Sequence, residues 1–377
     1  MDIVIDKKDT EKYFWAKYYL QSENTLLKAA QELAVGQSIG NPNARSIWET
    51  DEMIEDYCAK ILYNNKNFLR QEGEVWIGFP YALIDWTSDG VSQLLCILMG
   101  GQMDIDNIKK CHLLKLEIDL SKTDFKPPKY GIKGIRERVG SYNKPLFGGI
   151  IKPKTGMTPD QLLDMTKEMV EGGADFIKED EIMSNPAICP LDKRIDVITN
   201  YLLKTNAKTI YTFCINADAH HIVDRVNNVA KSGGPGVHLN FWSGLGSYKT
   251  IRNLDHNIFI HYQKSGDKVL TYKTHDFHIE WSVMCYLAVI CGVDFIHAGM
   301  IGGYLNDDEE EMKRIIELLR SYDVMPALSC GMNPDLVAPI AEKVGMDWMA
   351  NVGGFIHSDK KGTKAGSLKM RKAVDSL

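Results

Sequence analysis

The chain has 377 residues, of which 44% are hydrophobic and 25% are charged, a composition typical of a globular protein with room for two domains. Its net charge of −6 argues against nucleic-acid binding, which requires a basic stripe, and no apolar run reaches the 18 residues of a membrane span. The N-terminus lacks the apolar core of a signal peptide. The eight cysteines show no paired spacing, which predicts reduced thiols and a cytoplasmic location.

The first part of the chain, residues 1–130, mixes two kinds of pattern. Residues 23–35 and 51–63 have helical periodicity, whereas residues 74–79 and 113–118 are typical of strands. This mixture predicts a separate α+β domain. The Pro-rich segment 126–131 is the expected connector to the rest of the chain.

From residue 145 onward, short apolar strands alternate with amphipathic helices. The expected strands are 146–151, 174–177, 209–215, 236–241, 257–261, 294–297, 325–329 and 348–352. Thr158 followed by Pro159 is a helix-start signal, and Asn333 followed by Pro334 is another. Eight strand–helix units in about 230 residues predict a (β/α)8 TIM barrel over residues 131–377. A doubly wound sheet is disfavoured because no Gly-rich turn follows the first strand.

Residues 172–181, Gly-Gly-Ala-Asp-Phe-Ile-Lys-Glu-Asp-Glu, end the second expected strand in Lys178 and three carboxylates. Burying such charges without a partner costs free energy, and two interpretations give them partners. In the first, the lysine and the acids form an ordinary salt-bridge cluster. In the second, the carboxylates hold a hard divalent cation such as Mg²⁺, with the lysine beside it.

Other polar residues and glycines stand at the ends of the expected barrel strands, where the active sites of such barrels lie. They are Lys152, Lys154, Lys178, Asp180, Glu181, His261, His297, Ser329, Gly331, Gly353 and Gly354. Each has a structural alternative: a histidine can be a hydrogen-bonded structural residue, a serine can cap a helix, and a glycine pair can form a tight turn. Their concentration at one rim favours a functional site, with the glycines after strands 7 and 8 binding a phosphate.

These motifs, in this order, resemble the RuBisCO large-subunit superfamily. The similar segments are Ile-Ile-Lys-Pro-Lys-Thr-Gly at 150–156, the stretch 172–181, His-Ala-Gly at 297–299, Ser-Cys-Gly at 329–331 and Gly353-Gly354, together with segments 131–136 and 145–148 at the domain junction. The resemblance covers nearly the whole chain. It implies an N-terminal ferredoxin-like α+β domain, a C-terminal barrel, and a homodimer, or a multiple of dimers, whose active sites are shared between subunits.

The resemblance also implies roles for individual residues. Lys178 would react with CO₂ to form a carbamate and, with Asp180 and Glu181, would bind Mg²⁺. Lys152 would move a proton near the substrate carbonyl with the support of Lys154. The remaining positions would bind substrate: His261 and His297 in the pocket, Ser329, Gly331, Gly353 and Gly354 at a phosphate or other oxygens, and Trp48 from the partner subunit.

The sequence departs from the carboxylase pattern at several positions. The lysine that follows the sixth strand and stabilises the CO₂ adduct is Tyr304 here, and the arginine that binds the second phosphate is Tyr262. An asparagine of the N-terminal domain is replaced near Gln102, and Ile47 precedes Trp48 where a threonine is expected. Tyrosine cannot replace the charged, bidentate clamp of an arginine.

The pattern of retained and lost residues predicts a RuBisCO-like enzyme that does not fix CO₂. Mg²⁺ and a lysine would enolise a mono-phosphorylated keto-sugar or sugar acid, in an isomerase, tautomerase or decarboxylase reaction. Three alternatives stay open. The chain could be a genuine ribulose-bisphosphate carboxylase of archaeal-like form, with Lys360, Lys361 or Lys364 replacing the missing lysine. It could be a ligand-binding barrel without catalysis. It could also be a phosphate-binding barrel enzyme in which Lys152 forms a Schiff base.

Overall fold

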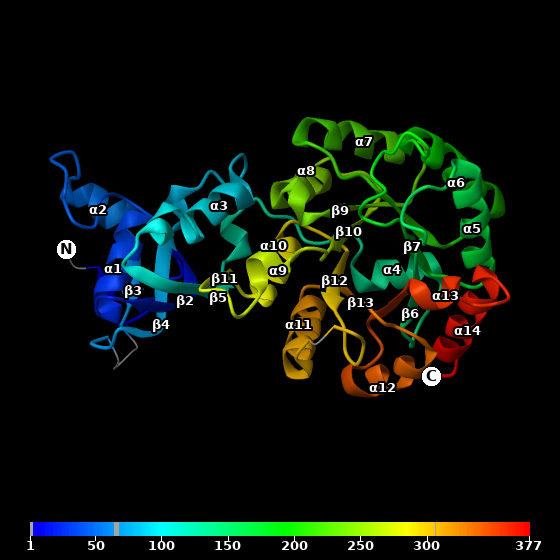
Figure 1. Ribbon diagram of the computed structural model, residues 1–377. Coiled ribbons are helices and arrows are strands. Elements are labelled where there is room, and N and C mark those ends of the chain that lie inside the picture. Colours follow the sequence, from blue (N-terminus) through cyan, green and yellow to red (C-terminus); the bar gives the residue numbers. More distant parts are fainter. Residues whose placement is uncertain (1–2, 64–67, 306) are drawn as a thin grey trace. The chain divides into compact units, whose positions relative to one another are not determined.

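The computed structural model describes residues 3–63, 68–305 and 307–377. By contacts, the chain divides into two compact units. One contains residues 1–125 and 266–287, and the other contains residues 126–265 and 288–377. Both are visible in the ribbon of Figure 1. Within the described residues, no helix is both long enough and apolar enough to cross a bilayer. All eight cysteines are described and free, as expected from their spacing.

The first unit is an α+β domain built on one sheet with the strand order β1-β3-β4-β2-β5-β11. Its strands are β1 (Val4–Ile5), β2 (Tyr13–Ser22), β3 (Lys60–Leu62), β4 (Glu72–Pro80), β5 (Ile108–Glu117) and β11 (Phe277–Ile279). Its helices are α1 (Leu26–Gly36), α2 (Asp51–Tyr57), α3 (Gly90–Leu98) and α9 (Lys268–Thr271). The expected α+β class is confirmed.

Two features of this unit differ from the sequence-based expectations. The helix expected over 51–63 ends at Tyr57, because Lys60 and Ile61 pair with Gly78 and Ile77 of β4. The edge strand β11 comes from the middle of the barrel sequence and pairs in parallel with β5. Its short backbone ladder explains why residues 266–287 group with the N-terminal sheet.

The second unit is a closed barrel in which eight parallel strands of the described chain follow the order β10-β12-β13-β14-β6-β7-β8-β9. The strands are β6 (Leu146–Ile150), β7 (Phe176–Lys178), β8 (Ile210–Cys214), β9 (Gly236–Asn240), β10 (Phe259–Gln263), β12 (Phe295–Gly299), β13 (Met325–Leu328) and β14 (Met349–Val352). All eight strands expected from the sequence are present, so the predicted TIM barrel is confirmed.

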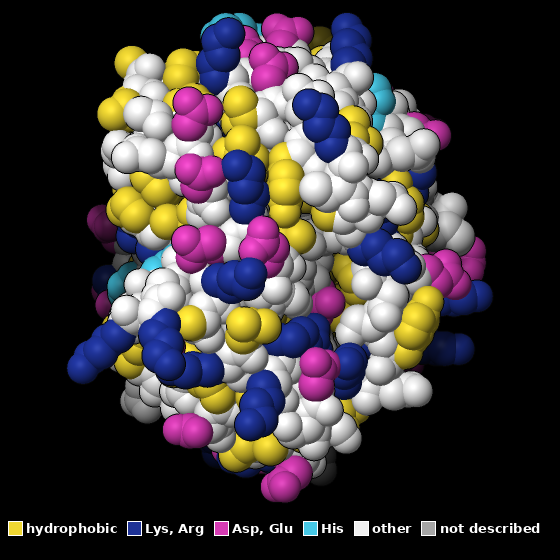
Figure 2. Space-filling view, turned by 90° about the vertical axis from the view of Figure 1, so that its right-hand side faces the viewer, with side chains coloured by type: hydrophobic (Ala, Val, Ile, Leu, Met, Phe, Trp, Pro, Cys, Tyr) yellow, Lys and Arg dark blue, Asp and Glu magenta, His cyan; other side chains and the backbone are white. Residues whose placement is uncertain are grey.

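The barrel helices follow the strands in chain order. They are α4 (Gly131–Val139), which precedes β6, α5 (Pro159–Glu171), α6 (Leu191–Thr205), α7 (Ala219–Lys231), α8 (Leu245–Asn253), α11 (Glu309–Ser321), α12 (Pro334–Val344), α13 (Gly354–His357) and α14 (Thr363–Asp375). The helix α10 (Trp281–Ile290), between β10 and β12 in the sequence, has its residues 281–287 in the first unit and the rest in the second. Thr158 caps α5 in a complete capping box with Gln161, and Asn333 caps α12, as predicted. On the face shown in Figure 2, basic and acidic side chains are interspersed, in keeping with the modest net charge.

The N-terminal end of the barrel is filled by an apolar layer. Its members are Ile135 of α4 and Leu146, Phe176, Ile210, Phe259, Phe295, Met325, Ala327 and Met349 of the strands. Side chains on one face of a strand recur every second residue, so the next inward positions lie nearer the C-terminal rim. Those positions include Lys178, Thr212, His238, His261, His297 and Asn351, all of which are buried. The interior therefore changes from apolar to polar along the strands, and this polar layer is the base of the candidate site.

Candidate active site

The charged stretch after β7 divides into two groups with different partners. Glu179 is fully buried, and its carboxylate accepts hydrogen bonds from Arg194, from the Tyr211 hydroxyl and from the Cys214 backbone N–H. The Arg194 Nε–Oε1 distance is 2.8 Å, and both residues of this ion pair are inaccessible to solvent. One of the three acids therefore forms a salt bridge within the wall of the barrel, as in the structural interpretation of the sequence.

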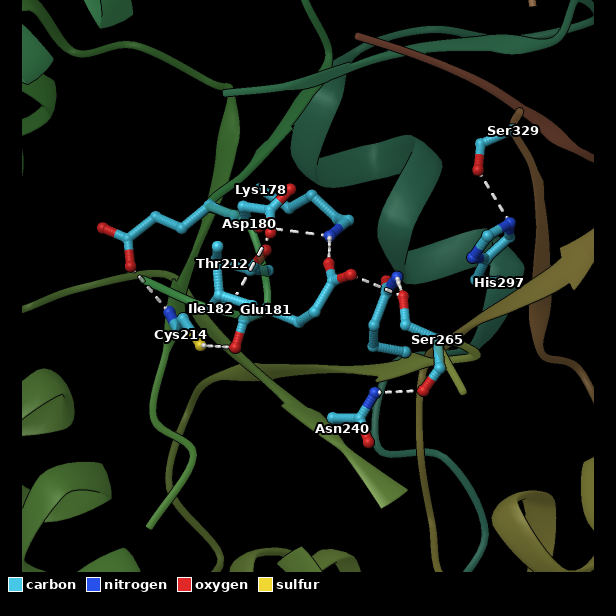
Figure 3. A network of polar contacts seen from close by, with 12 residues as sticks. Lys178, Asp180, Glu181, Ile182, Thr212, Cys214, Asn240, Ser265, His297 and Ser329 are labelled. Atoms are coloured by element: carbon cyan, nitrogen blue, oxygen red, sulfur yellow. Dashed lines mark hydrogen bonds and ion pairs between the residues drawn. The ribbon is translucent and has the colours of Figure 1, made fainter. Parts of the chain in front are cut away.

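Lys178, Asp180 and Glu181 form the second group (Figure 3). Lys178 Nζ lies 3.7 Å from Glu181 Oε2 and donates a hydrogen bond to the Glu179 carbonyl oxygen at 3.1 Å. Lys152, which follows β6, places its Nζ 2.5 Å from Asp180 Oδ2. The structure thus brings together four of the residues predicted to bind metal and move protons: Lys152, Lys178, Asp180 and Glu181.

Burial changes the protonation of this group. It lowers the pKa of the Lys178 ammonium, and the charges of Glu181 and Asp180 only partly oppose that shift. For Glu181, desolvation alone would raise the pKa of the carboxyl. The Lys178 charge and a hydrogen bond from Ser265 outweigh it, so the pKa is lowered and the carboxylate stays ionised. The site therefore combines an ionised carboxylate with a lysine that loses its proton more easily than a lysine in water does.

The polar layer contains three buried histidines, of which the sequence predicted His261 and His297. Burial lowers the pKa of His297 to about 3, with the charges of Lys178 and Lys264 adding to the effect. The pKa values of His238 and His261 are also well below the ordinary value, again mainly because of burial. All three rings are therefore neutral near pH 7. Within the described residues, neither ring nitrogen of His261 has a hydrogen-bond partner.

The predicted oxygen-binding residues stand at the ends of β13 and β14. The Ser329 hydroxyl is buried and lies 2.7 Å from His297 Nε2, which joins these two predicted residues directly. Gly331 has φ +102°, a value that favours glycine, and a Cβ there would lie 2.9 Å from the Tyr304 ring. Gly353 lies beside Lys152, since a Cβ at this glycine would be 3.4 Å from Lys152 Cε.

The other predicted site residues are more exposed. Gly354 opens the short helix α13, and a Cβ there would meet no described atom within 4 Å. Lys154 is exposed, but its charge contributes to the lowered pKa of Glu181. Trp48 belongs to the first unit, where its side chain is 79% exposed, next to Ile47 at 92%. An exposed Trp48 is compatible with the predicted contact to a partner subunit.

The positions that depart from the carboxylase pattern also have defined surroundings. Tyr262 is fully buried, and its ring packs against Tyr248 of α8 with ring centroids 5.1 Å apart. Neighbouring side chains of a strand face opposite sides, so Tyr262 faces the helix layer while His261 faces the interior. Tyr304 is 79% exposed, and its backbone N–H donates to the Cys330 carbonyl oxygen. Gln102 is buried in the first unit, and its backbone N–H donates to Gln37.

Several polar residues of the rim were missed by the sequence reasoning. Ser265 donates to Glu181 Oε1 at 2.6 Å, and Asn216 donates to the Glu181 carbonyl oxygen at 2.7 Å. Lys264 is buried, and its charge lowers the pKa of His297. Their positions in the sequence could have revealed three of them, because Asn216, Asn240 and Ser265 end or closely follow the barrel strands β8, β9 and β10. Asn351, whose buried amide has no partner within the described residues, lies on β14.

A hard divalent cation needs several oxygen ligands. Within the described residues, no group of three His, Cys, Asp and Glu side chains is placed to hold a metal ion. Asp180 and Glu181 supply two carboxylates, and the charges of both act on Lys178. A third oxygen ligand would exist only if the Lys178 amine reacted with CO₂. With that modification the three residues fit Mg²⁺, which prefers oxygen ligands.

Comparison with known proteins identifies the family. Residues 131–377 match the family model described as "Ribulose bisphosphate carboxylase large chain, catalytic domain". The chain belongs to the RuBisCO large-chain family. The resemblance inferred from the ordered motifs is therefore confirmed, and the family covers the whole barrel sequence.

Members of the RuBisCO family with different activities are similar to this chain. A ribulose bisphosphate carboxylase of Pyrococcus furiosus is 28% identical, with 93% of this chain and 84% of that protein covered. A 2,3-diketo-5-methylthiopentyl-1-phosphate enolase of Exiguobacterium sibiricum is 25% identical, with 97% and 92% covered. The octameric Rubisco of Pyrococcus horikoshii OT3 superimposes with a TM-score of 0.90 at 25% identity, covering 100% of this chain and 90% of that chain. Carboxylases and enolases of this family are therefore similar to this chain at nearly the same level of sequence identity.

Proposed function

We propose that this chain is a RuBisCO-like enzyme that enolises a mono-phosphorylated keto-sugar or sugar acid with Mg²⁺, without fixing CO₂. The observation that carries the proposal is the cluster of Lys152, Lys178, Asp180 and Glu181 at one rim. By the resemblance, Tyr304 and Tyr262 replace two cations of the carboxylases. On this proposal, the chain keeps the residues that would make an enediolate and lacks those that would carry out the later carboxylation.

Mg²⁺ would be held by Asp180, Glu181 and a Lys178 carbamate, where it would act as a Lewis acid toward the substrate carbonyl. The lowered pKa of Lys178 supports this role, because CO₂ reacts with the neutral amine. The two neighbouring carboxylates would compensate the cation's charge.

The chain's own groups would then move the proton. Lys152 would take up the proton of the carbon next to the carbonyl: the electrons of that C–H bond form the C=C bond, and the carbonyl electrons move to the oxygen, which gives the enolate. The same amine would return the proton at a neighbouring carbon. His297 and Ser329 would hold a substrate oxygen through neutral hydrogen bonds, and the N–H groups near Gly331, Gly353 and Gly354 would bind the phosphate.

The assembly is part of the proposal. We infer a homodimer, or a multiple of dimers, in which Trp48 reaches the partner's phosphate site. Its exposure in the first unit supports this, as do archaeal Rubisco structures of similar fold described as dimeric and octameric. The eight free thiols fit the reducing cytoplasm.

Proton exchange with solvent tests the reaction directly. Phosphorylated ketoses and keto acids are incubated in D₂O with Mg²⁺ and bicarbonate, and loss of the exchangeable C–H signal is followed by NMR. Wild type should exchange at least one compound, and Lys178→Ala should exchange none. Lys167→Ala is the matched control, since Lys167 is an exposed lysine of α5 paired with Asp164. If no compound exchanges, or if Lys178→Ala exchanges as fast as wild type, the proposal is wrong.

Carboxylation is the second candidate, favoured by the similarity to the Pyrococcus furiosus carboxylase. Incubation with ribulose bisphosphate and labelled CO₂ distinguishes the two. We expect no incorporation above background, since an exposed Tyr304 supplies no positive charge for the CO₂ adduct. If labelled CO₂ is incorporated and the incorporation depends on Lys178, the chain is a carboxylase and the proposal that it only enolises its substrate is wrong.

A further inference from the structure

The two oxygens of the Glu181 carboxylate have different surroundings. Oε1 accepts a hydrogen bond from the Ser265 hydroxyl at 2.6 Å, whereas Oε2 faces Lys178 Nζ at 3.7 Å. Figure 3 shows Ser265 on one side of the carboxylate and Lys178 on the other. Only Oε2 is therefore directed at the position where a cation would be held.

The ionised carboxylate of Glu181 can only accept the Ser265 hydrogen bond, and a second residue reinforces this direction. Gln263, the last residue of β10, donates from its Nε2 to Ser265 Oγ at 2.8 Å. A hydroxyl has one proton, and this amide already occupies the acceptor side of the oxygen. The proton of Ser265 is therefore directed at Glu181, and the order of donation is Gln263 to Ser265 to Glu181.

The backbone around this contact is also tied together. Asn240 donates from Nδ2 to the Ser265 carbonyl oxygen at 2.7 Å. Its own backbone N–H donates to Asn216 Oδ1 at 2.8 Å, and Asn216 Nδ2 in turn donates to the Glu181 carbonyl oxygen at 2.7 Å. The circuit Glu181–Asn216–Asn240–Ser265 joins the ends of the four adjacent strands β7, β8, β9 and β10. Movement of Glu181 or Ser265 would break bonds at several strand ends, so the carboxylate is held in one orientation.

We propose that Ser265 is a positioning residue that restricts Glu181 to binding a cation through one oxygen and thereby favours Mg²⁺ over Ca²⁺. Mg²⁺ requires near-ideal octahedral geometry at short distances, to which a single carboxylate oxygen is suited. Ca²⁺ accepts six to eight ligands and readily takes both oxygens of one carboxylate. The inference rests on the proposed metal role of Glu181.

Removal of the hydroxyl gives the central test. In Ser265→Ala, Oε1 loses its partner and the carboxylate can rotate to offer both oxygens. Loss of such an outer contact commonly weakens metal binding about 10- to 100-fold. We expect the Mg²⁺ dissociation constant to rise within that range, the Ca²⁺ constant to change less, and the preference for Mg²⁺ to fall accordingly. Ser265→Thr, which keeps a hydroxyl, should restore wild-type values.

The measurement is isothermal titration of each metal into the full chain at fixed bicarbonate, and it requires no substrate. Ser367→Ala is the matched control, because Ser367 is a fully buried serine of α14 in the same unit. Should Ser265→Ala fold poorly, Gln263→Met provides a second variant: without its amide the hydroxyl is free to rotate, and a smaller change in the same direction is expected.

The outcomes separate this inference from the proposed function. A wild-type chain that binds no Mg²⁺ overturns the proposed function, and the role of Ser265 with it. A wild type that binds Mg²⁺, with Ser265→Ala within twofold of it for both metals, overturns the role of Ser265 alone. Equal weakening of both metals in Ser265→Ala also contradicts the inference, because the one-oxygen restriction predicts a change in preference.

Discussion

Glu179, which forms a buried ion pair with Arg194, stands in the sequence between Lys178 and Asp180 of the proposed metal site. Besides its two contacts with the carboxylate, the guanidinium donates to the carbonyl oxygens of Cys189 and Ser184 at 2.6 and 2.8 Å. We consider the substitution Arg194→Met, which keeps much of the side-chain length but removes the charge and all of these donors.

The expected loss of stability follows from the Glu179 carboxylate, which the substitution leaves buried without its charged partner. Glu179 would keep two neutral donors, the Tyr211 hydroxyl and the Cys214 N–H, while its charge stays inaccessible to water. Removing one partner of a buried ion pair typically costs about 3–5 kcal/mol, because the remaining charge is not compensated. For a unit of this size, each kcal/mol lowers the melting temperature by about 2–4 °C, so a fall of about 6–20 °C is expected.

Thermal unfolding followed by circular dichroism measures this effect. The double variant Glu179→Gln/Arg194→Met should recover part of the loss, since no buried charge then remains. Lys167→Met, at an exposed pair, is the control and should leave the melting temperature nearly unchanged. A fall of less than about 2 °C for Arg194→Met would refute the view that this pair compensates a buried carboxylate.

Three further outcomes are expected. The pKa of buried His297 is about 3 in the folded chain against 6.5 in the unfolded one, so only the unfolded state binds this proton between those pH values. Its contribution to stability is complete above about pH 6.5 and falls by about 1.4 kcal/mol per pH unit as the pH drops toward 3, measurable by urea unfolding at pH 7.5 and 5.5. Gly331→Ala should destabilise the rim and weaken phosphate binding, because its positive φ and the nearby Tyr304 ring leave no room for a Cβ; unchanged inorganic phosphate affinity would contradict this. Lys152→Met removes the ion pair of buried Asp180 and should abolish proton exchange while keeping Mg²⁺ binding within about tenfold; loss of binding beyond that would show a structural role instead.

Much of the barrel could be predicted from local patterns. Strand positions followed from short apolar runs, and helix starts followed from capping residues such as Thr158, whose side chain does cap α5. The barrel also fixes where strand ends meet, so Lys178 and His297 could be assigned to one rim before their contacts were known. The helix expected over 51–63 was wrong at its end, since the pairing of Lys60 with Gly78 of β4 is not visible locally.

The roles of individual side chains depended on tertiary structure. The sequence by itself determined that three acids follow one strand, but packing against Arg194, 15 residues away from Glu179, decided that one of them belongs to the barrel wall. The Ser265 contact to Glu181 joins residues 84 positions apart and could not be read from spacing. Periodicity along a strand is a property of the local backbone, and the sequence therefore determined the strands and their order. Which charges are paired, and which remain available for chemistry, depends on distant residues that only the closed barrel brings together.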